Sequence, residues 1–174
     1  HQPLVEENYI FAYNGEIYNY QDLSKKYFKK AYKSDTNLFF QLLISGQKDK
    51  IKNCSGFFSY VLLNKSKMII SGGRDVLGKK PLYYFVDEDY AIFASEEVAI
   101  LKLLDSKLKV NKKSLISYLY FKSIFFGNTI FNGIKELPPG SNFTFDIKKW
   151  KFEKEYNWHN YYSLPLKKSI KPEF

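Results

Sequence analysis

Four short apolar runs between Gly56 and Glu97 constrain the fold of this chain more than any other feature. They cover residues 57 to 63, 67 to 71, 82 to 86 and 90 to 94, with turn-forming residues between them. Each run has the length of a strand, and the aromatic content of 19% agrees, because flat rings pack well on a pleated surface. Residues 64–66 and 87–89 are predicted hairpin tips, since Asn and Asp accept backbone hydrogen bonds in turns. The pattern predicts an antiparallel sheet.

Helices and further strands are predicted around this sheet. Apolar residues at helical spacing and polar caps indicate helices over residues 21–32, from Ser34 to near Gly46, over 96–104, and over 113–121 after Asn111 as a cap. Further strands are predicted over residues 9–13, 129–132, 141–147 and 150–156. With 174 residues and 45% hydrophobic content, the chain can bury the core of one domain.

The first predicted strand leads into a polar cluster formed by Asn14, Gly15 and Glu16. We expect the strand to stop at Asn14-Gly15, because this pair readily forms a tight turn. The same residues have a second interpretation. An Asn side chain and an adjacent backbone N–H can hold the oxyanion of a tetrahedral intermediate in acyl transfer. The pair alone favours the turn, and the catalytic interpretation needs support from other motifs.

The charge of the chain points to a solvated lysine surface more than to nucleic-acid binding. The formal net charge is +9, and Arg74 is the only arginine among the 27 basic residues. Nucleic-acid surfaces use arginine for bidentate contacts to phosphates and bases. We therefore rank nucleic-acid binding last. We expect Arg74 to form a buried ion pair or to bind backbone carbonyls, in preference to clamping a substrate.

The sequence offers no metal site, and by residue type alone Cys54 is the candidate nucleophile. The two histidines, His1 and His159, have no partners at metal-ligand spacing, and no Walker-type phosphate loop is present. Cys54 is the only cysteine, lies among apolar residues, and is expected in the core. A single cysteine gives no intramolecular disulfide, so a reducing cytoplasm is the expected location. No apolar run is long enough to span a bilayer, and no membrane partner is expected.

Several motifs, taken in order, resemble the N-terminal glutaminase domain of glutamine-hydrolysing asparagine synthetases, which are class II glutamine amidotransferases. The resemblance covers nearly the whole chain. It rests on residues 11–20 around Asn-Gly-Glu-Ile-Tyr-Asn, Ser34-Asp35-Thr36, Gly56-Phe57-Phe58-Ser59, residues 74–84 from Arg-Asp to Tyr-Tyr, residues 93–96, and residues 134–140 ending in Pro-Pro-Gly. The long run from Arg74 is the most specific of these.

The resemblance implies an α+β fold of the N-terminal nucleophile type, with two stacked antiparallel sheets flanked by helices. It implies that the Asn14 side chain and the Gly15 N–H form an oxyanion hole. Glu16 and Asp35 would hold the amino end of glutamine, because a carboxylate pairs with an ammonium through charge-assisted hydrogen bonds. Asp35 also has an interpretation as a helix cap, and the two roles are compatible.

The family nucleophile is an N-terminal cysteine, whereas this chain begins with His1. We therefore expect a domain truncated at both ends, with residues 1–162 as a partial glutamine amidotransferase domain and 163–174 as a linker toward a synthetase domain. ATP and Mg²⁺ are expected only in that synthetase domain, and the chain alone is expected to be inactive. A homodimer is possible. Two alternatives remain, namely an amidotransferase that acts on a sugar or cell-surface precursor, and a non-catalytic glutamine-binding module.

Overall fold

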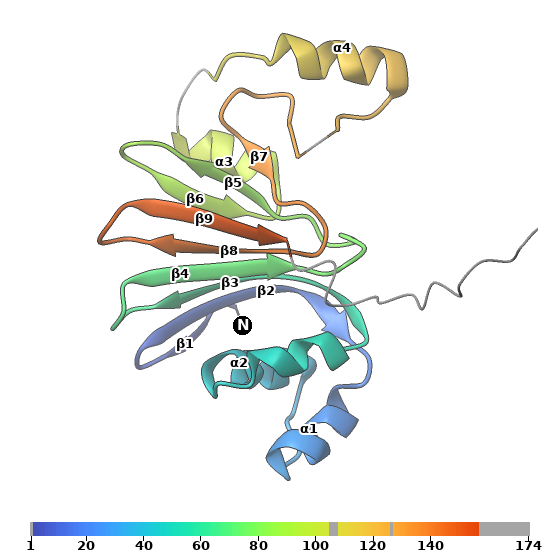
Figure 1. Cartoon of the computed structure of the whole chain (residues 1–174), viewed down its shortest axis with the longest axis vertical. Coiled ribbons are helices and arrows are strands. Elements are labelled where there is room, and N and C mark those ends of the chain that lie inside the picture. Colours follow the sequence, from blue (N-terminus) through green and yellow to red (C-terminus); the bar gives the residue numbers. More distant parts are fainter. Residues whose placement is uncertain (1, 105–107, 126, 157–174) are drawn as a thin grey trace, which may run out of the picture.

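The computed structural model describes residues 2–104, 108–125 and 127–156, which form four stacked layers (Figure 1). Helices α1 (Tyr20–Phe28) and α2 (Asp35–Ile44) form the first layer, followed by the short 3-10 helix η1 (Lys48–Asn53). The second layer is a six-stranded antiparallel sheet in the order β1 (Leu4–Glu6), β2 (Tyr9–Ile17), β3 (Gly56–Asn64), β4 (Ile69–Arg74), β8 (Ser141–Asp146) and β9 (Lys151–Tyr156).

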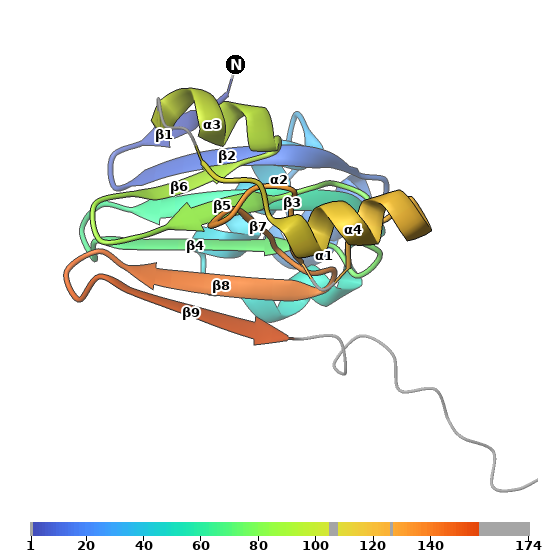
Figure 2. The ribbon, with the colours of Figure 1, turned by 90° about the horizontal axis from the view of Figure 1, so that it is seen from above.

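The third layer is a smaller antiparallel sheet in the order β6 (Ala91–Ala94), β5 (Tyr83–Val86) and β7 (Lys135–Glu136). Helix α3 (Glu97–Leu104) packs on it, and α4 (Lys112–Phe121) lies farther out (Figure 1). Seen from above, β5 and β6 lie over the larger sheet (Figure 2). This arrangement confirms the predicted α+β fold with two stacked antiparallel sheets flanked by helices.

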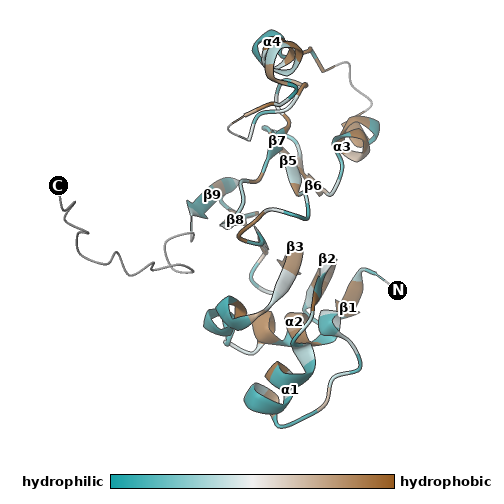
Figure 3. Ribbon diagram, turned by 90° about the vertical axis from the view of Figure 1, so that its right-hand side faces the viewer, coloured by the Kyte–Doolittle hydropathy of each residue, from teal (hydrophilic) through white to brown (hydrophobic). Residues whose placement is uncertain are grey.

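Three apolar clusters hold the layers together. The largest joins α1 and α2 to β2 and β3, and its centre is formed by Phe11, Leu38 and Phe39, which are 0% exposed. Figure 3 shows hydrophobic residues in β3 and in α2. The second cluster lies between the sheets, where Phe93 stacks on Phe143 with ring centroids 4.6 Å apart. The third lies between the smaller sheet and α3. Burial of these rings supplies the main driving force for folding.

Most of the predicted elements are present. The four apolar runs form β3 to β6, and both hairpin tips are confirmed. Asp87 accepts hydrogen bonds from Asp89 N–H and Tyr90 N–H at 2.9 and 2.7 Å, and Asn64 accepts one from Lys67 N–H at 3.0 Å. The predicted caps are also confirmed, since Ser34 caps α2 and Asn111 caps α4.

Three local predictions are wrong. The first strand does not stop at Asn14-Gly15 but runs on to Ile17, because β2 pairs with β3 along its whole length. The first helix ends at Phe28, where Lys29 takes a left-handed conformation with φ of 50°. Residues 129–132 form no strand and contribute only an isolated bridge between Phe131 and Val110. Strands β1 and β7 were not predicted, and both are too short to show a period.

Some predictions concern residues outside the described ranges. They include the linker at 163–174, the end of the partial domain at residue 162, and both histidines, His1 and His159. In the described part of the chain, no helix is long and apolar enough to cross a membrane.

Candidate functional site

The candidate site lies on the outer edge of β2, meaning the backbone of residues 12–17 on the side away from β3. In the described part of the chain, β1 covers β2 only from Tyr9 to Phe11. Farther along the outer edge, side chains accept the hydrogen bonds of the β2 backbone. Gln2 Oε1 accepts a hydrogen bond from Tyr13 N–H at 2.7 Å, and Asp35 Oδ2 accepts one from Ile17 N–H at 3.0 Å.

Gly15 lies between these two residues, and its N–H also points to the outer edge. Its partner across the sheet is Phe58. The Phe58 N–H donates to Asp75 Oδ2 at 3.2 Å, and the Phe58 carbonyl accepts from Asp75 N–H at 2.8 Å. Both polar groups of Phe58 therefore face away from β2. Gly15 and Phe58 form a non-hydrogen-bonded pair, in which the N–H groups of both residues point outward.

Glycine is required at position 15 by close packing. A Cβ at Gly15 would lie 2.7 Å from Phe58 Cα and 2.8 Å from Phe58 Cβ. Other pairs of this kind in the same two strands, such as Tyr13 and Tyr60, carry side chains, so the lack of room is a local close approach at Gly15. The Asn-Gly pair is thus not a turn. It is a place where β2 comes unusually close to β3 and presents an N–H at the outer edge.

Asn14 and Glu16 lie on the opposite face of β2 from Phe11, Tyr13 and Ile17, because side chains alternate along a strand. Glu16 is exposed, and Asn14 is half-buried. Asn14 lines a hollow of about 300 Å³ whose polar residues also include Gln2, Ser59 and Ser95. Asn14 thus lines this hollow, and the next residue of β2, Gly15, directs its N–H to the outer edge of the strand.

Asp35 approaches the outer edge from the side of α2. The interpretation of Asp35 as the helix cap is wrong, because Ser34 is the cap and Asp35 is the first residue of the helix, where the helix dipole favours a carboxylate. Its Oδ1 accepts from Thr36 N–H at 2.7 Å, and its Oδ2 also accepts from the Tyr13 hydroxyl at 3.3 Å. Its Oδ1 also accepts from the Thr36 hydroxyl at 3.3 Å, so the roughly four acceptor sites of the carboxylate are already in use, and a substrate ammonium would have to replace one of these donors.

Tyr13 and Gln2 are residues of this site that the sequence did not single out. Burial, and then the nearby Asp35 carboxylate, raise the pKa of Tyr13 well above its ordinary value, so its hydroxyl remains a donor to Asp35. The alternation of Phe11, Tyr13 and Ile17 placed Tyr13 on the α2 side. Its contact with Asp35 depends on the packing of α2 against β2, which the sequence pattern does not show.

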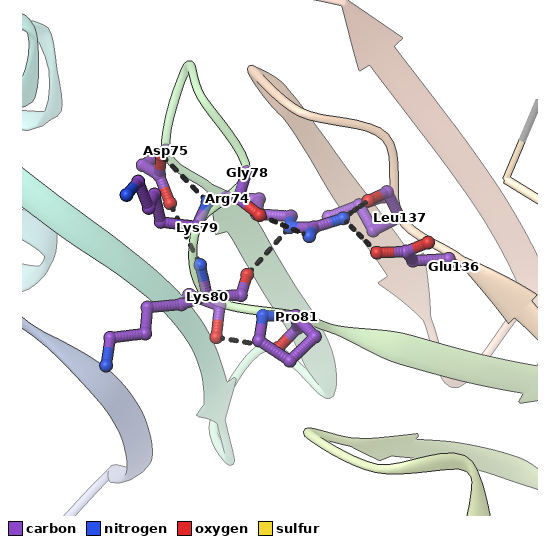
Figure 4. A network of polar contacts seen from close by, with 9 residues as sticks. Arg74, Asp75, Gly78, Lys79, Lys80, Pro81, Glu136 and Leu137 are labelled. Atoms are coloured by element: carbon purple, nitrogen blue, oxygen red, sulfur yellow. Dashed lines mark hydrogen bonds and ion pairs between the residues drawn. The ribbon is translucent and has the colours of Figure 1, made fainter. Parts of the chain in front are cut away.

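Arg74, at the end of β4, ties together the loop after β4 and the segment of Glu136 and Leu137 (Figure 4). Its side chain donates to the carbonyls of Lys80, Leu137 and Gly78 at 2.7, 2.5 and 2.6 Å, and it forms an ion pair with Glu136 at 2.8 Å. Arg74 is 7% exposed. These contacts confirm the prediction of a buried bridge.

Cys54 is a poor nucleophile in this structure. It packs against the core of α1, α2, β2 and β3, and burial raises the pKa of its thiol from 9.0 to about 12. A thiol with this pKa is protonated at neutral pH. The expectation of a core cysteine is confirmed.

Alkylation of Cys54 by iodoacetamide at pH 8 is expected to be roughly 1000-fold slower in the native chain than in the same chain unfolded in denaturant, because the thiolate is the reacting species and the pKa rises by about 3 units. Mass spectrometry of quenched samples measures both rates. Equal rates in the two states would show that Cys54 is accessible and ionised, and would reopen its candidacy as a nucleophile.

Among the residues that the structure describes, no group of three or more His, Cys, Asp or Glu side chains could hold a metal ion. The chemistry available at the outer edge of β2 is therefore that of an amide side chain, an outward backbone N–H and two carboxylates. Such a set can hold a developing oxyanion and a substrate ammonium.

Comparison with known proteins identifies related sequences. A family model described as "Glutamine amidotransferase domain" matches residues 1–158. Asparagine synthetase [glutamine-hydrolyzing] 1 of Bacillus subtilis is 31% identical over 149 residues, which are 82% of this chain and 23% of that protein. Putative asparagine synthetase [glutamine-hydrolyzing] 2 of Methanocaldococcus jannaschii is 33% identical over 158 residues, which are 89% of this chain and 31% of that protein.

Among solved structures, the glutamine phosphoribosylpyrophosphate amidotransferase of B. subtilis superposes with a TM-score of 0.58 at 20% identity. The match covers 89% of this chain and 31% of that chain. At this identity the likeness concerns the fold, which is the N-terminal nucleophile type. The chain spans about a quarter to a third of the length of the curated relatives that it matches.

Proposed function

Because the chain belongs to the glutamine amidotransferase domain family, we propose that it is the glutaminase part of a glutamine-hydrolysing asparagine synthetase. One observation carries the proposal. Gly15 directs its N–H to the outer edge of β2, next to the Asn14 side chain. Two preset donors at an accessible edge match the requirement of an oxyanion hole.

In the proposed reaction, a cysteine thiolate attacks the side-chain amide carbon of glutamine. The carbonyl oxygen becomes an oxyanion and accepts hydrogen bonds from Gly15 N–H and the Asn14 amide. The carbon–nitrogen bond then breaks, the nitrogen takes a proton, and ammonia leaves. Water hydrolyses the remaining thioester to glutamate and restores the thiol.

We propose that the thiolate of this reaction belongs to a cysteine outside the 174 residues. Cys54 is the one cysteine in the sequence, and burial keeps its thiol protonated. We further propose that the ammonia serves ATP-dependent amidation of aspartate in a synthetase domain, that ATP and Mg²⁺ bind only there, and that the protein is a cytoplasmic ligase. Residues 1–162 would belong to the glutaminase domain and 163–174 to the linker, and a homodimer is a further proposal.

Recognition of glutamine is assigned to Glu16 and Asp35. Asp35 contacts the outer edge of β2 at Ile17, two residues after Gly15, where its carboxylate accepts a hydrogen bond from Ile17 N–H. Glu16 is exposed on the face of β2 opposite to Tyr13. Two carboxylates close to the oxyanion donors suit the α-ammonium of glutamine, because charge-assisted hydrogen bonds to a carboxylate are strong.

The intact gene product is expected to release ammonia from glutamine without ATP. Asp35→Asn is expected to raise the KM for glutamine about 10- to 100-fold, since a charged hydrogen bond contributes about 1.5–3 kcal/mol. Asp146→Asn, at the turn between β8 and β9, serves as the matched control and should leave KM unchanged. A coupled glutamate assay measures all three proteins.

Absence of ammonia release from a gene product that carries an N-terminal cysteine would overturn the proposal. Glutamine binding by calorimetry without turnover would support the non-catalytic module instead. Formation of asparagine from aspartate and ATP distinguishes a synthetase from an amidotransferase that acts on a sugar or cell-surface precursor.

A further inference from the structure

We propose that Asp75 is a positioning residue for the Gly15 oxyanion donor, an inference that rests on the proposed glutaminase function. Asp75 is 3% exposed, although a buried carboxylate is costly unless it is hydrogen-bonded. Its Oδ2 accepts from Phe58 N–H at 3.2 Å, and its Oδ1 accepts from Leu77 N–H at 2.9 Å. Longer contacts of 3.4 Å come from the N–H groups of Lys79 and Lys80.

The Asp75 carboxylate replaces a backbone group at the end of β4. The ladder between β3 and β4 ends at the pair Ser59 and Arg74. Beyond it, Asp75 N–H still donates to the Phe58 carbonyl, but the Asp75 carbonyl turns away and accepts from Gly78 N–H and Gly140 N–H at 3.0 and 2.8 Å. The Phe58 N–H would then have no backbone carbonyl opposite it. The side chain of Asp75 supplies the acceptor.

The hydrogen bonds between Asp75 and Phe58 fix the direction of the Gly15 N–H. Because Asp75 binds both the N–H and the carbonyl of Phe58, both groups point toward β4. Phe58 must then face Gly15 as a non-hydrogen-bonded pair, and the Gly15 N–H must point to the outer edge. Asp75 thus acts on the oxyanion hole through one strand, without touching the substrate.

Arg74 holds the same loop from the other side. Its bonds to the carbonyls of Gly78 and Lys80 fix the turn that places the Asp75 carboxylate opposite Phe58. A Cβ at Gly78, whose φ is +63°, would lie 2.6 Å from Pro139 Cγ, so this turn also packs tightly against the loop before β8. The carboxylate is therefore held rigidly enough to act as a positioning group.

Asp75→Asn tests the inference. The change replaces one carboxylate oxygen by an NH₂ group. This group cannot accept a hydrogen bond, so one of the backbone N–H donors loses its acceptor. In the intact gene product, kcat for glutamine is expected to fall about 10- to 100-fold with KM changed less than about twofold, because the oxyanion forms only in the transition state. In ¹⁵N–¹H spectra of the 174-residue chain, the Gly15 and Phe58 amide signals are expected to shift.

Asp146→Asn is the matched control, since Asp146 Oδ1 accepts from Lys149 N–H at 3.0 Å in a turn of the same sheet. It should change neither kcat nor the Gly15 signal. An unshifted Gly15 amide in Asp75→Asn, or a normal kcat per folded molecule, overturns the positioning role. If the wild-type gene product hydrolyses no glutamine, the proposed function fails, while the Gly15 signal still decides whether Asp75 orients this amide.

Discussion

Gly15→Ala is expected to lower the free energy of unfolding of the 174-residue chain by about 3 kcal/mol, at the upper end of the usual cost of overpacking. The added Cβ meets the backbone and Cβ of Phe58, so β3 must move, because no flexible side chain can give way. Urea denaturation measures the loss. In the intact gene product, kcat for glutamine is expected to fall about 100-fold or more, since displacement of the Gly15 N–H removes one oxyanion donor.

Gly46→Ala is the control for Gly15→Ala. A Cβ at Gly46 meets no atom within 4 Å, but the φ of +75° disfavours any side chain, so a loss of only about 1 kcal/mol is expected. Gly15 itself has no positive φ, so a loss there as small as that at Gly46 would mean that the added Cβ is accommodated without displacing β3. The close approach of β2 to β3 would then not be the reason for glycine at position 15.

Arg74→Met is expected to destabilise the chain by about 3 kcal/mol, chiefly because carbonyl groups that Arg74 binds lose their donor, at about 1–3 kcal/mol for each buried group left unsatisfied. The change leaves Glu136 without its cation and three carbonyl groups without their donor. Methionine fills much of the same volume, so the loss reports the polar contacts more than a cavity. Thermal and urea unfolding measure it.

Lys151→Met removes a solvent-exposed ion pair and serves as the control for Arg74→Met. Lys151 pairs with Glu153 at the surface on β9, where solvent screens the charges, and no measurable loss is expected. A loss for Arg74→Met as small as that for Lys151→Met would contradict the bridging role of Arg74 and would return it to consideration as a substrate contact.

Local chemistry explains which elements could be predicted from the sequence. The strands of the hairpins, the caps Ser34 and Asn111, and the turn at Asp87 depend on neighbours within a few residues, and the structure confirms them. Residues 129–132 have an apolar pattern similar to that of the strands, yet form only a bridge, because pairing requires a partner strand that sequence periodicity does not reveal.

The sequence by itself determined the α+β class, the packing of Cys54 against the core and the bridging Arg74, and its ordered motifs indicated the amidotransferase family. Only the tertiary structure decided the conformation of Asn14 and Gly15. By local preference the pair forms a turn, but nine residues of pairing with β3 and the hold of Asp75 on Phe58 keep it in an extended strand. The direction of the Gly15 N–H follows from contacts made 43 and 60 residues along the chain, at Phe58 and Asp75, and no local pattern encodes it.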